Sequence, residues 1–460
     1  MAHAVSSHVY PERLHHGLAR PWCTALKSGP KGAIAIAITP FDAAAILIVL
    51  AAVLGYINHR FLGLPSSIGL TLMGALASLL VIGVDRLLPG SQLSGAVTDF
   101  LKSIDFHTVL MDGMLSFLLF AGALHVDWFE MRKGRWPILV LSTIGVLVST
   151  VIIGAGFRLL TTLIGLPLPL IWCFVFGALI SPTDPVAVMA VLKRAAVPPT
   201  LQATVAGESL FNDGVGVVVF AILLSVALGT DSFSVGHAAG DFLREAGGGL
   251  LLGLAIGWTA FRAMESIDDY IVEVMISLAV VMGGYSLAHV IHTSGPVAMA
   301  VAGLLIGNHG VAHAMSDVTR DHLLKFWSLI DEILNAVLFL LIGLEVIAIA
   351  GDIRLVILGA LAIPLVIAVR AVSVGLPLLG MRPWLSLGRL ALPTLIWGGL
   401  RGGISIALAL SLPDGPARTI VLAATYIVVL FAVIVQGGTI GALIERIKTA
   451  EELGRINART

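Results

Sequence analysis

Long apolar runs separated by short polar connections fill most of the chain beyond residue 40. A helix needs about 20 mostly apolar residues to cross the hydrocarbon layer of a membrane. Thirteen runs have about that length, and each is bounded by charges, prolines or glycine clusters. The predicted spans are 40–60, 65–84, 104–126, 136–163, 167–192, 203–229, 235–263, 269–293, 295–310, 322–350, 353–380, 388–412 and 417–445. The pattern predicts an all-α polytopic membrane protein with no separate soluble domain.

The composition agrees with the pattern. Of 460 residues, 58% are hydrophobic and 12% charged, with a mean hydropathy of +1.00, whereas soluble domains carry about 25% charged residues. The net charge of −1 provides no basic field for nucleic acid, so we expect no nucleic-acid partner. Cys23 and Cys173 are too few and too far apart for a disulfide framework or a CxxC metal site. Residues 1–32 lack the features of a signal peptide and are expected to form a disordered extension.

Lysine and arginine in the connections predict the orientation of the chain in the membrane. Fifteen of these residues fall on one side of the predicted helices and six on the other, apart from four in the N-terminal extension. Cytoplasmic connections carry the excess of basic residues. The bias therefore predicts an N-terminus outside the cell and a cytoplasmic C-terminus, with residues 448–460 as a short cytoplasmic tail.

The sixth run begins with the polar stretch GESLFNDG at 207–214. A charged side chain at mid-bilayer costs roughly 2.5 to 3.5 kcal/mol, so such residues usually face a protein interior or an aqueous cavity. On a helix, Glu208 and Asp213 lie about 140° apart and therefore point in different directions. We expect Glu208 to form a structural ion pair with Arg370, a basic residue near the middle of another run. Asp213 is then free to face a cavity, the alternative being a satisfied polar contact between helices.

Two other runs contain residues that should interrupt a helix. The fifth run includes Ser181-Pro182-Thr183-Asp184-Pro185, where two prolines remove backbone donors at mid-membrane. The twelfth run includes GGLRGG at 398–403, where four glycines flank Arg401. Paired discontinuous helices in corresponding halves are typical of transporter binding sites. Because the two runs are seven apart in order, segments 1–6 and 8–13 are predicted to be inverted repeats linked by segment 7. Close packing through glycine is the alternative interpretation.

The remaining candidates are weaker. Arg401 is expected either to offset carboxylates and helix C-terminal dipoles or to bind an anionic substrate. Asp331 and Glu332 are expected at the polar start of a helix. Further acidic residues near predicted helix ends are Asp112, Glu273 and Glu345. The chain contains no HExxH, P-loop or nucleophile-elbow motif, which argues against ATP-driven pumping, hydrolysis and enzymatic activity in general.

Five stretches together resemble the monovalent cation/proton antiporter-1 family, which includes bacterial sodium/proton antiporters and eukaryotic NHE-type exchangers. The stretches are LLFAGALHVD at 118–127, GALISPTDPVAV at 177–188, GESLFNDGVGVVVF at 207–220, LFLLIGLE at 338–345 and GGLRGGIS at 398–405. They follow one another in order across most of the chain. GGLRGG in place of the frequent GGLRGA is a small departure, and the N-terminal extension is not covered.

The resemblance implies a role for each matching residue. Asp213 is similar to the aspartate that binds either a cation or protons, and Asn212 to its companion amide in the electroneutral branch. Thr183, Asp184 and Ser209 are similar to residues beside the ion, so that Asp213, Thr183 and Ser209 are the implied ligands of transported Na⁺. Glu208 and Arg370 match the structural ion pair of the family, and Arg401 its crossing-helix arginine.

The resemblance also implies the architecture and the activity. The family fold has core helices, here about 136–229 and 353–445, dimerisation helices at about 40–126 and 269–350, and a linker helix at about 235–263 within a unit spanning 33–447. The expected function is electroneutral one-for-one exchange of Na⁺, with Li⁺ or K⁺ as alternative cations, for H⁺, in a homodimer in the cell (inner) membrane without a cofactor. A symporter that binds a small organic anion through Arg401 and a gated cation channel are the alternatives.

Overall fold

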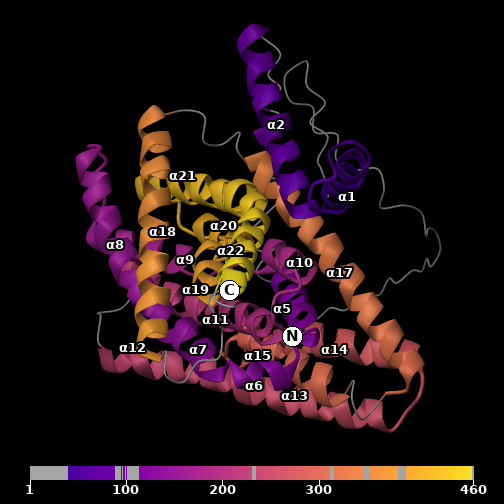
Figure 1. The fold of residues 1–460 in the computed structure, drawn as a ribbon. Coiled ribbons are helices and arrows are strands. Elements are labelled where there is room, and N and C mark those ends of the chain that lie inside the picture. Colours follow the sequence, from indigo (N-terminus) through magenta and orange to yellow (C-terminus); the bar gives the residue numbers. More distant parts are fainter. Residues whose placement is uncertain are drawn as a thin grey trace, which may run out of the picture.

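The computed structural model describes residues 40–88, 113–229, 235–310, 315–345, 352–381 and 390–457, with a few isolated positions between 95 and 100. Every regular element in these ranges is a helix (Figure 1). Nine helical stretches in them are long and apolar enough to cross a membrane. The all-α, multi-pass architecture is therefore confirmed. The predicted N-terminal extension at 1–32 and Asp112 lie outside the described residues.

The longer helices form the frame of the molecule. They are α1 (Pro40–Ile57), α2 (Ser66–Leu87), α8 (Val146–Leu163), α11 (Pro199–Leu228), α13 (Gly248–Glu265), α14 (Tyr270–Val290), α17 (Asp317–Leu344), α18 (Ile353–Met381), α21 (Pro416–Phe431) and α22 (Gly437–Asn457). The shorter helices are α5 (Leu115–Leu124), α6 (Trp128–Lys133), α7 (Arg135–Val140), α9 (Leu170–Ile180), α10 (Val186–Arg194), α12 (Val235–Phe242), α15 (Gly295–Leu305), α19 (Ala391–Trp397) and α20 (Gly403–Leu410). Single π-helical turns are η1 (Asn58–Leu62), η3 (Leu141–Gly145), η4 (Leu243–Gly247), η5 (Ile306–Gly310) and η8 (Ala432–Gln436).

Both predicted helix interruptions are present. The fifth span divides into α9 and α10, and the twelfth into α19 and α20, with residues 181–185 and 398–402 between the halves. The prolines and the glycine cluster break the helices for the reasons given above. The count of thirteen spans stays a prediction, because the third span is described only from residue 113 and the twelfth only from residue 390.

One expectation about α17 is wrong. Asp331 and Glu332 lie near the middle of this helix and not at its start, because α17 begins at Asp317. The Ser316 hydroxyl accepts a hydrogen bond from the Thr319 amide at 3.4 Å and so caps the helix N-terminus. The polar residues that follow the cap are helical although they precede the apolar part of the span.

The helices pack in two groups. In the first group, α9 contacts α8 and α11, while α18 contacts α8 and α21; α8 and α18 run side by side along one flank (Figure 1). In the second group, α17 contacts α2, and α15 contacts α5, α13 and α14. Glycines allow close approach within each group, since an added Cβ would overlap the Thr150 carbonyl at Gly177 and the Thr71 carbonyl at Gly343. The groups meet where α11 packs against α15 and α5, and α17 against α20.

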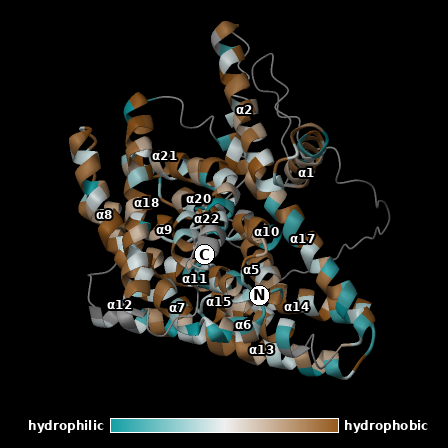
Figure 2. Ribbon diagram, viewed as in Figure 1, coloured by the Kyte–Doolittle hydropathy of each residue, from teal (hydrophilic) through white to brown (hydrophobic). Residues whose placement is uncertain are grey.

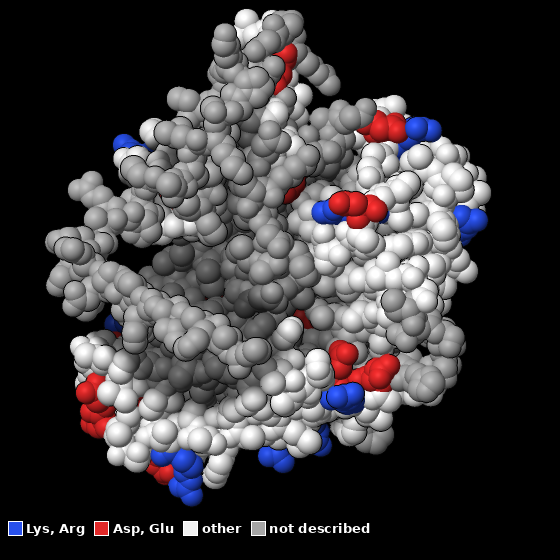
Figure 3. Space-filling model, turned by 180° about the vertical axis from the view of Figure 1, so that it is seen from behind, with Lys and Arg blue, Asp and Glu red and all other residues white. Residues whose placement is uncertain are grey.

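The surface suits a lipid environment. Brown, hydrophobic residues occupy most of the length of long helices such as α8 and α18 (Figure 2), and large apolar side chains such as Leu80, Leu163 and Leu251 are more than two-thirds exposed. On the opposite face, the described charged side chains form small groups, with white, uncharged residues between the groups on the right of the view (Figure 3). A membrane would cover the exposed apolar side chains.

Candidate ion-binding site

Helix α11 brings four polar side chains into the interior of the first helix group. Glu208 and Ser209 are each 1% exposed, Asn212 is fully buried and Asp213 is 6% exposed. Burial of so many polar groups is costly unless they are hydrogen-bonded or paired. Their partners therefore indicate which side chains stabilise the fold and which remain available to bind a ligand.

Asn212 joins α11 to the interrupted helix. Its side-chain oxygen accepts a hydrogen bond from the Thr183 amide at 3.2 Å, and its Nδ2 donates to Thr183 Oγ1 at 2.8 Å. The same Nδ2 also donates to Glu208 Oε1 at 3.2 Å. Ser209 donates its hydroxyl to the Thr183 carbonyl oxygen. The 181–185 segment is thus held against α11 through both the backbone and the side chain of one threonine.

Asp213 has different surroundings. Within the part of the chain that the structure describes, no hydrogen bond or ion pair reaches its carboxylate, although it lies one helical position after Asn212. Its neighbour Gly214 packs against Val297 of α15, where an added Cβ would come within 2.7 Å of Cγ2. This part of α11 therefore lies where the two helix groups meet. The carboxylate is buried and available for a ligand.

Glu208 and Arg370 form a buried ion pair. Arg370 donates from Nη1 and Nη2 to the two carboxylate oxygens of Glu208, each at 2.7 Å, and from Nε to the Leu395 carbonyl at 3.1 Å. The side chains are 2% and 7% exposed for Glu208 and Arg370 respectively. This two-pronged geometry is the strong form of arginine–carboxylate pairing. It connects α11 with α18 and with the end of α19, and it leaves neither charge free.

The two interrupted segments contact each other directly. The Asp184 amide donates to the Leu400 carbonyl at 2.9 Å, and Asp184 Oδ1 accepts from the Val186 amide at 2.9 Å, at the start of α10. A carboxylate at a helix N-terminus is stabilised by the unpaired amides there. An added Cβ at Gly402 would overlap the Asp184 carboxylate, so a glycine is required for this close approach.

Arg401 lies at the end of α9. It is 2% exposed, and its Nη1 donates to the carbonyl oxygens of Ser181 and Pro182, the latter at 2.9 Å. These carbonyls follow the last turn of α9, where the helix dipole is negative. The interaction is the one expected for a guanidinium that offsets a helix C-terminus. Arg401 Nε has no hydrogen-bond partner among the described residues.

Sequence reasoning missed two features of this region. Gln436, a polar residue in an otherwise apolar run, is 5% exposed and donates to the Trp397 carbonyl at the end of α19 at 3.3 Å. Asp331 of α17 accepts from Asn335 at 3.0 Å and lies close enough to Asp184 for their charges to interact. The isolated amide in an apolar run was the signal for Gln436. Nothing in the pattern placed Asp331 near Asp184.

No group of three or more histidine, cysteine, aspartate or glutamate residues that could hold a metal ion occurs in the described ranges. Asp213, Thr183 and Ser209 carry side-chain oxygens, the type of ligand that hard cations prefer.

A sequence model of the family described as "Sodium/hydrogen exchanger, transmembrane" matches residues 48–446, a range that includes every residue of the candidate site. The chain belongs to this family. Two related exchangers illustrate the similarity. The Na(+)/H(+) antiporter NhaP of Pseudomonas aeruginosa is 46% identical over 417 residues, which cover 90% of this chain and 98% of the relative. The Na(+)/H(+) antiporter NhaH of Halobacillus dabanensis is 36% identical over 389 residues, covering 83% and 92%.

A solved structure shares the fold of this exchanger. The sodium proton antiporter MjNhaP1 from Methanocaldococcus jannaschii, determined at pH 8, superimposes with a TM-score of 0.67 over 88% of this chain and 98% of that chain. The two sequences are 20% identical. The family model and the two relatives confirm the resemblance noted in the sequence, and the solved structure confirms the helical fold.

Proposed function

We propose that this exchanger carries Na⁺ in one direction and H⁺ in the other, with the Asp213 carboxylate as the shared site. The observation that carries the proposal is the contrast within α11: Glu208 is neutralised by Arg370, whereas Asp213 is buried without a partner among the described residues. The similarity to proteins named Na(+)/H(+) antiporters supports the same activity here.

A carboxylate can hold a cation or a proton but does not easily hold both, which makes the two ligands competitors. In the proposed site, Asp213, Thr183 and Ser209 supply oxygens to Na⁺, while Asp184 and Asn212 hold the 181–185 segment beside them. Asn212 is uncharged, so loading the site with Na⁺ or with H⁺ gives it the same charge. One-for-one, voltage-insensitive exchange follows.

Transport also requires movement. We infer that the first helix group is the core, that it carries the loaded site across the membrane against the second group, and that the second group forms a homodimer. Rigid-body motion of this kind is expected for inverted repeats around a site between discontinuous helices. The proposed location is the inner membrane with the C-terminus in the cytoplasm, in agreement with the distribution of basic residues.

The proposal is tested in proteoliposomes that hold a preformed pH gradient. NaCl should collapse the gradient, and raising the proton concentration should raise the Na⁺ concentration needed for half-maximal rate. Asp213→Asn should lower the rate at least about a hundredfold, because the site loses the charge that both ligands need. Asp321→Asn, which removes an exposed carboxylate paired with Lys325 on α17, is the matched control and should keep the wild-type rate.

Three results would overturn parts of the proposal. Exchange retained in Asp213→Asn, with the protein inserted at the wild-type level, would remove Asp213 from the shared site. A rate that follows a potential imposed with valinomycin would exclude electroneutral exchange. A comparison of Na⁺, Li⁺ and K⁺ in one preparation determines which cation is carried, and no response to any of them would exclude the function itself.

A further inference from the structure

Gln436 lies at a point where the helical backbone is irregular. It belongs to η8, a single π-helical turn at Ala432–Gln436 that joins α21 to α22. Such turns insert one residue into a helix and often occur at functional sites. Here the turn directs a buried amide towards α19, and its Nε2 donates to the Trp397 carbonyl.

The bond to Trp397 satisfies the end of a half-helix inside the protein. Both α9 and α19 end within the first helix group, where their last carbonyls lack helical partners. Arg401 binds the carbonyls that follow α9, whereas Gln436 binds the last carbonyl of α19 and Arg370 binds the Leu395 carbonyl two residues earlier. Different donors thus bind the ends of the two half-helices. Of these three donors, Arg401 belongs to an interrupted segment and Arg370 to the ion pair, whereas Gln436 belongs to neither.

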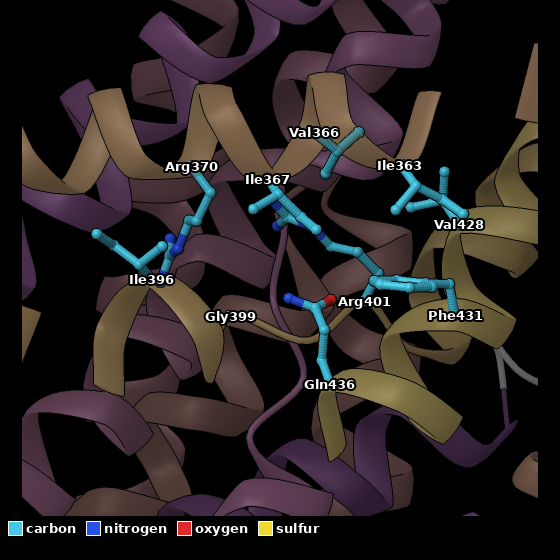
Figure 4. Close-up of a pocket in the computed structure, with 10 residues that line it drawn as sticks. All are labelled: Ile363, Val366, Ile367, Arg370, Ile396, Gly399, Arg401, Val428, Phe431 and Gln436. Atoms are coloured by element: carbon cyan, nitrogen blue, oxygen red, sulfur yellow. The ribbon is translucent and has the colours of Figure 1, made fainter. Parts of the chain in front are cut away.

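Gln436 and both buried arginines line one small cavity. Figure 4 shows Gln436 reaching from the η8 side towards the Arg401 side chain, with Gly399 beside it and Arg370 on the opposite helix. Arg401 Nε, which has no partner among the described residues, belongs to a residue that lines this cavity. The amide therefore lies next to the segment that carries Arg401.

We propose that Gln436 is a positioning residue for ion exchange, an inference that rests on the function proposed above. A chain of contacts connects Gln436 with the proposed ion site. Gln436 holds Trp397, the next residues form the 398–402 segment, and that segment binds the 181–185 segment through the Leu400 carbonyl and through Arg401. The 181–185 segment in turn presents Thr183 to α11. Loss of the amide therefore loosens the oxygens around the cation.

The test compares two substitutions that each remove one hydrogen bond to the same residue. Gln436→Met keeps the size of the side chain but loses the donor to the Trp397 carbonyl. Thr439→Val removes a different hydrogen bond of Trp397, in which the indole Nε1 donates to Thr439 Oγ1 at 3.0 Å. Initial rates against Na⁺ concentration are measured in proteoliposomes, and thermal unfolding of the purified protein is measured in parallel.

We expect Gln436→Met to raise the KM for Na⁺ by roughly fivefold, the factor that corresponds to one lost hydrogen bond between uncharged groups, with kcat largely kept. Thr439→Val should leave KM unchanged. Gln436→Leu, which also lacks a donor, is the second variant if methionine prevents folding, and it should show at least the same rise in KM.

The outcomes separate this inference from the function on which it rests. If the wild-type protein does not respond to Na⁺, the proposed function fails. If the wild-type protein exchanges and a folded Gln436 variant keeps the wild-type KM, only the positioning role fails. Equal changes in KM for Gln436→Met and Thr439→Val would also contradict it, because the carbonyl bond would then have no special effect.

Discussion

The segments 181–185 and 398–402 interrupt their helices with opposite chemistry. The first uses Pro182 and Pro185, which remove backbone donors and leave carbonyls exposed for Arg401 and Ser209. The second uses glycines, which remove side chains and leave space for those of its neighbours. An added Cβ would come within 2.5 Å of Arg370 Nε at Gly399 and would overlap Asp184 at Gly402. The first segment presents backbone carbonyl oxygens to Arg401 and Ser209, and the second provides space together with one guanidinium group, that of Arg401.

Gly402→Ala should have the largest effect on this arrangement. The new methyl group would collide with the Asp184 carboxylate, which is fixed at the start of α10, so the two segments must move apart. A displacement of about 1 Å at a reacting site can cost roughly a hundredfold in rate. We expect a loss of Na⁺-dependent gradient collapse of that order in proteoliposomes, with the protein still inserted.

The matched control is Gly438→Ala. This glycine lies in α22, and an added Cβ meets nothing within 4 Å. The rate should remain at the wild-type level. Wild-type exchange in Gly402→Ala would show that the close approach of the two segments is not needed, and the contrast between them would lose its functional meaning.

Arg370 connects α18 with α11 and with the end of α19, the half-helix before the glycine segment, and its loss should destabilise this packing. Removing one partner of a buried ion pair costs about 3 to 5 kcal/mol, because the other charge stays buried alone. Arg370→Ala and Glu208→Ala should therefore each lower the thermal unfolding temperature strongly. The double variant Glu208→Gln with Arg370→Met should be less damaging than the sum of the two alanine variants, since it leaves no unpaired charge.

An exposed ion pair provides the control for this experiment. Lys325 and Asp321 lie 2.6 Å apart on α17, with side chains more than half exposed. Lys325→Ala should leave the unfolding temperature nearly unchanged, since solvent already screens this pair. If Arg370→Ala proves as mild as Lys325→Ala, the buried pair does not hold α11, α18 and α19 together.

The comparison also explains which features the sequence could predict. The two helix interruptions were predictable because proline and glycine act locally on the backbone. The partnership of Glu208 with Arg370 was predictable because few charges lie inside apolar runs, which limits the choice of partners. The contact of Asp184 with the Leu400 carbonyl was not predictable, because it joins two backbone atoms more than 200 positions apart in the chain.

Local signals also misled in one case. The apolar pattern placed Asp331 and Glu332 at a helix start, since the pattern reports only the part of a helix that faces apolar surroundings. The capped polar turns before it belong to the same helix. Asp331 therefore lies deeper along α17 than expected, near Asp184. Hydrophobic periodicity predicts that such a helix exists more reliably than it predicts where the helix begins and ends.

The smallest expected effect comes from a comparison of two buried serines, one bound to the 181–185 segment and one in the helix that follows the 398–402 segment. Ser209→Ala removes the hydroxyl that donates to the Thr183 carbonyl, and Ser405→Ala removes an equally buried hydroxyl of α20 that has no partner among the described residues. The first change should raise the KM for Na⁺ roughly fivefold to tenfold, as expected for one lost buried hydrogen bond. The second should leave KM unchanged or slightly increase stability, because it relieves an unsatisfied polar group. A rise in KM for Ser405→Ala alone would place the functional hydroxyl in α20, after the glycine segment, and not in α11 against the proline segment, and so reverse the roles assigned to the two sides.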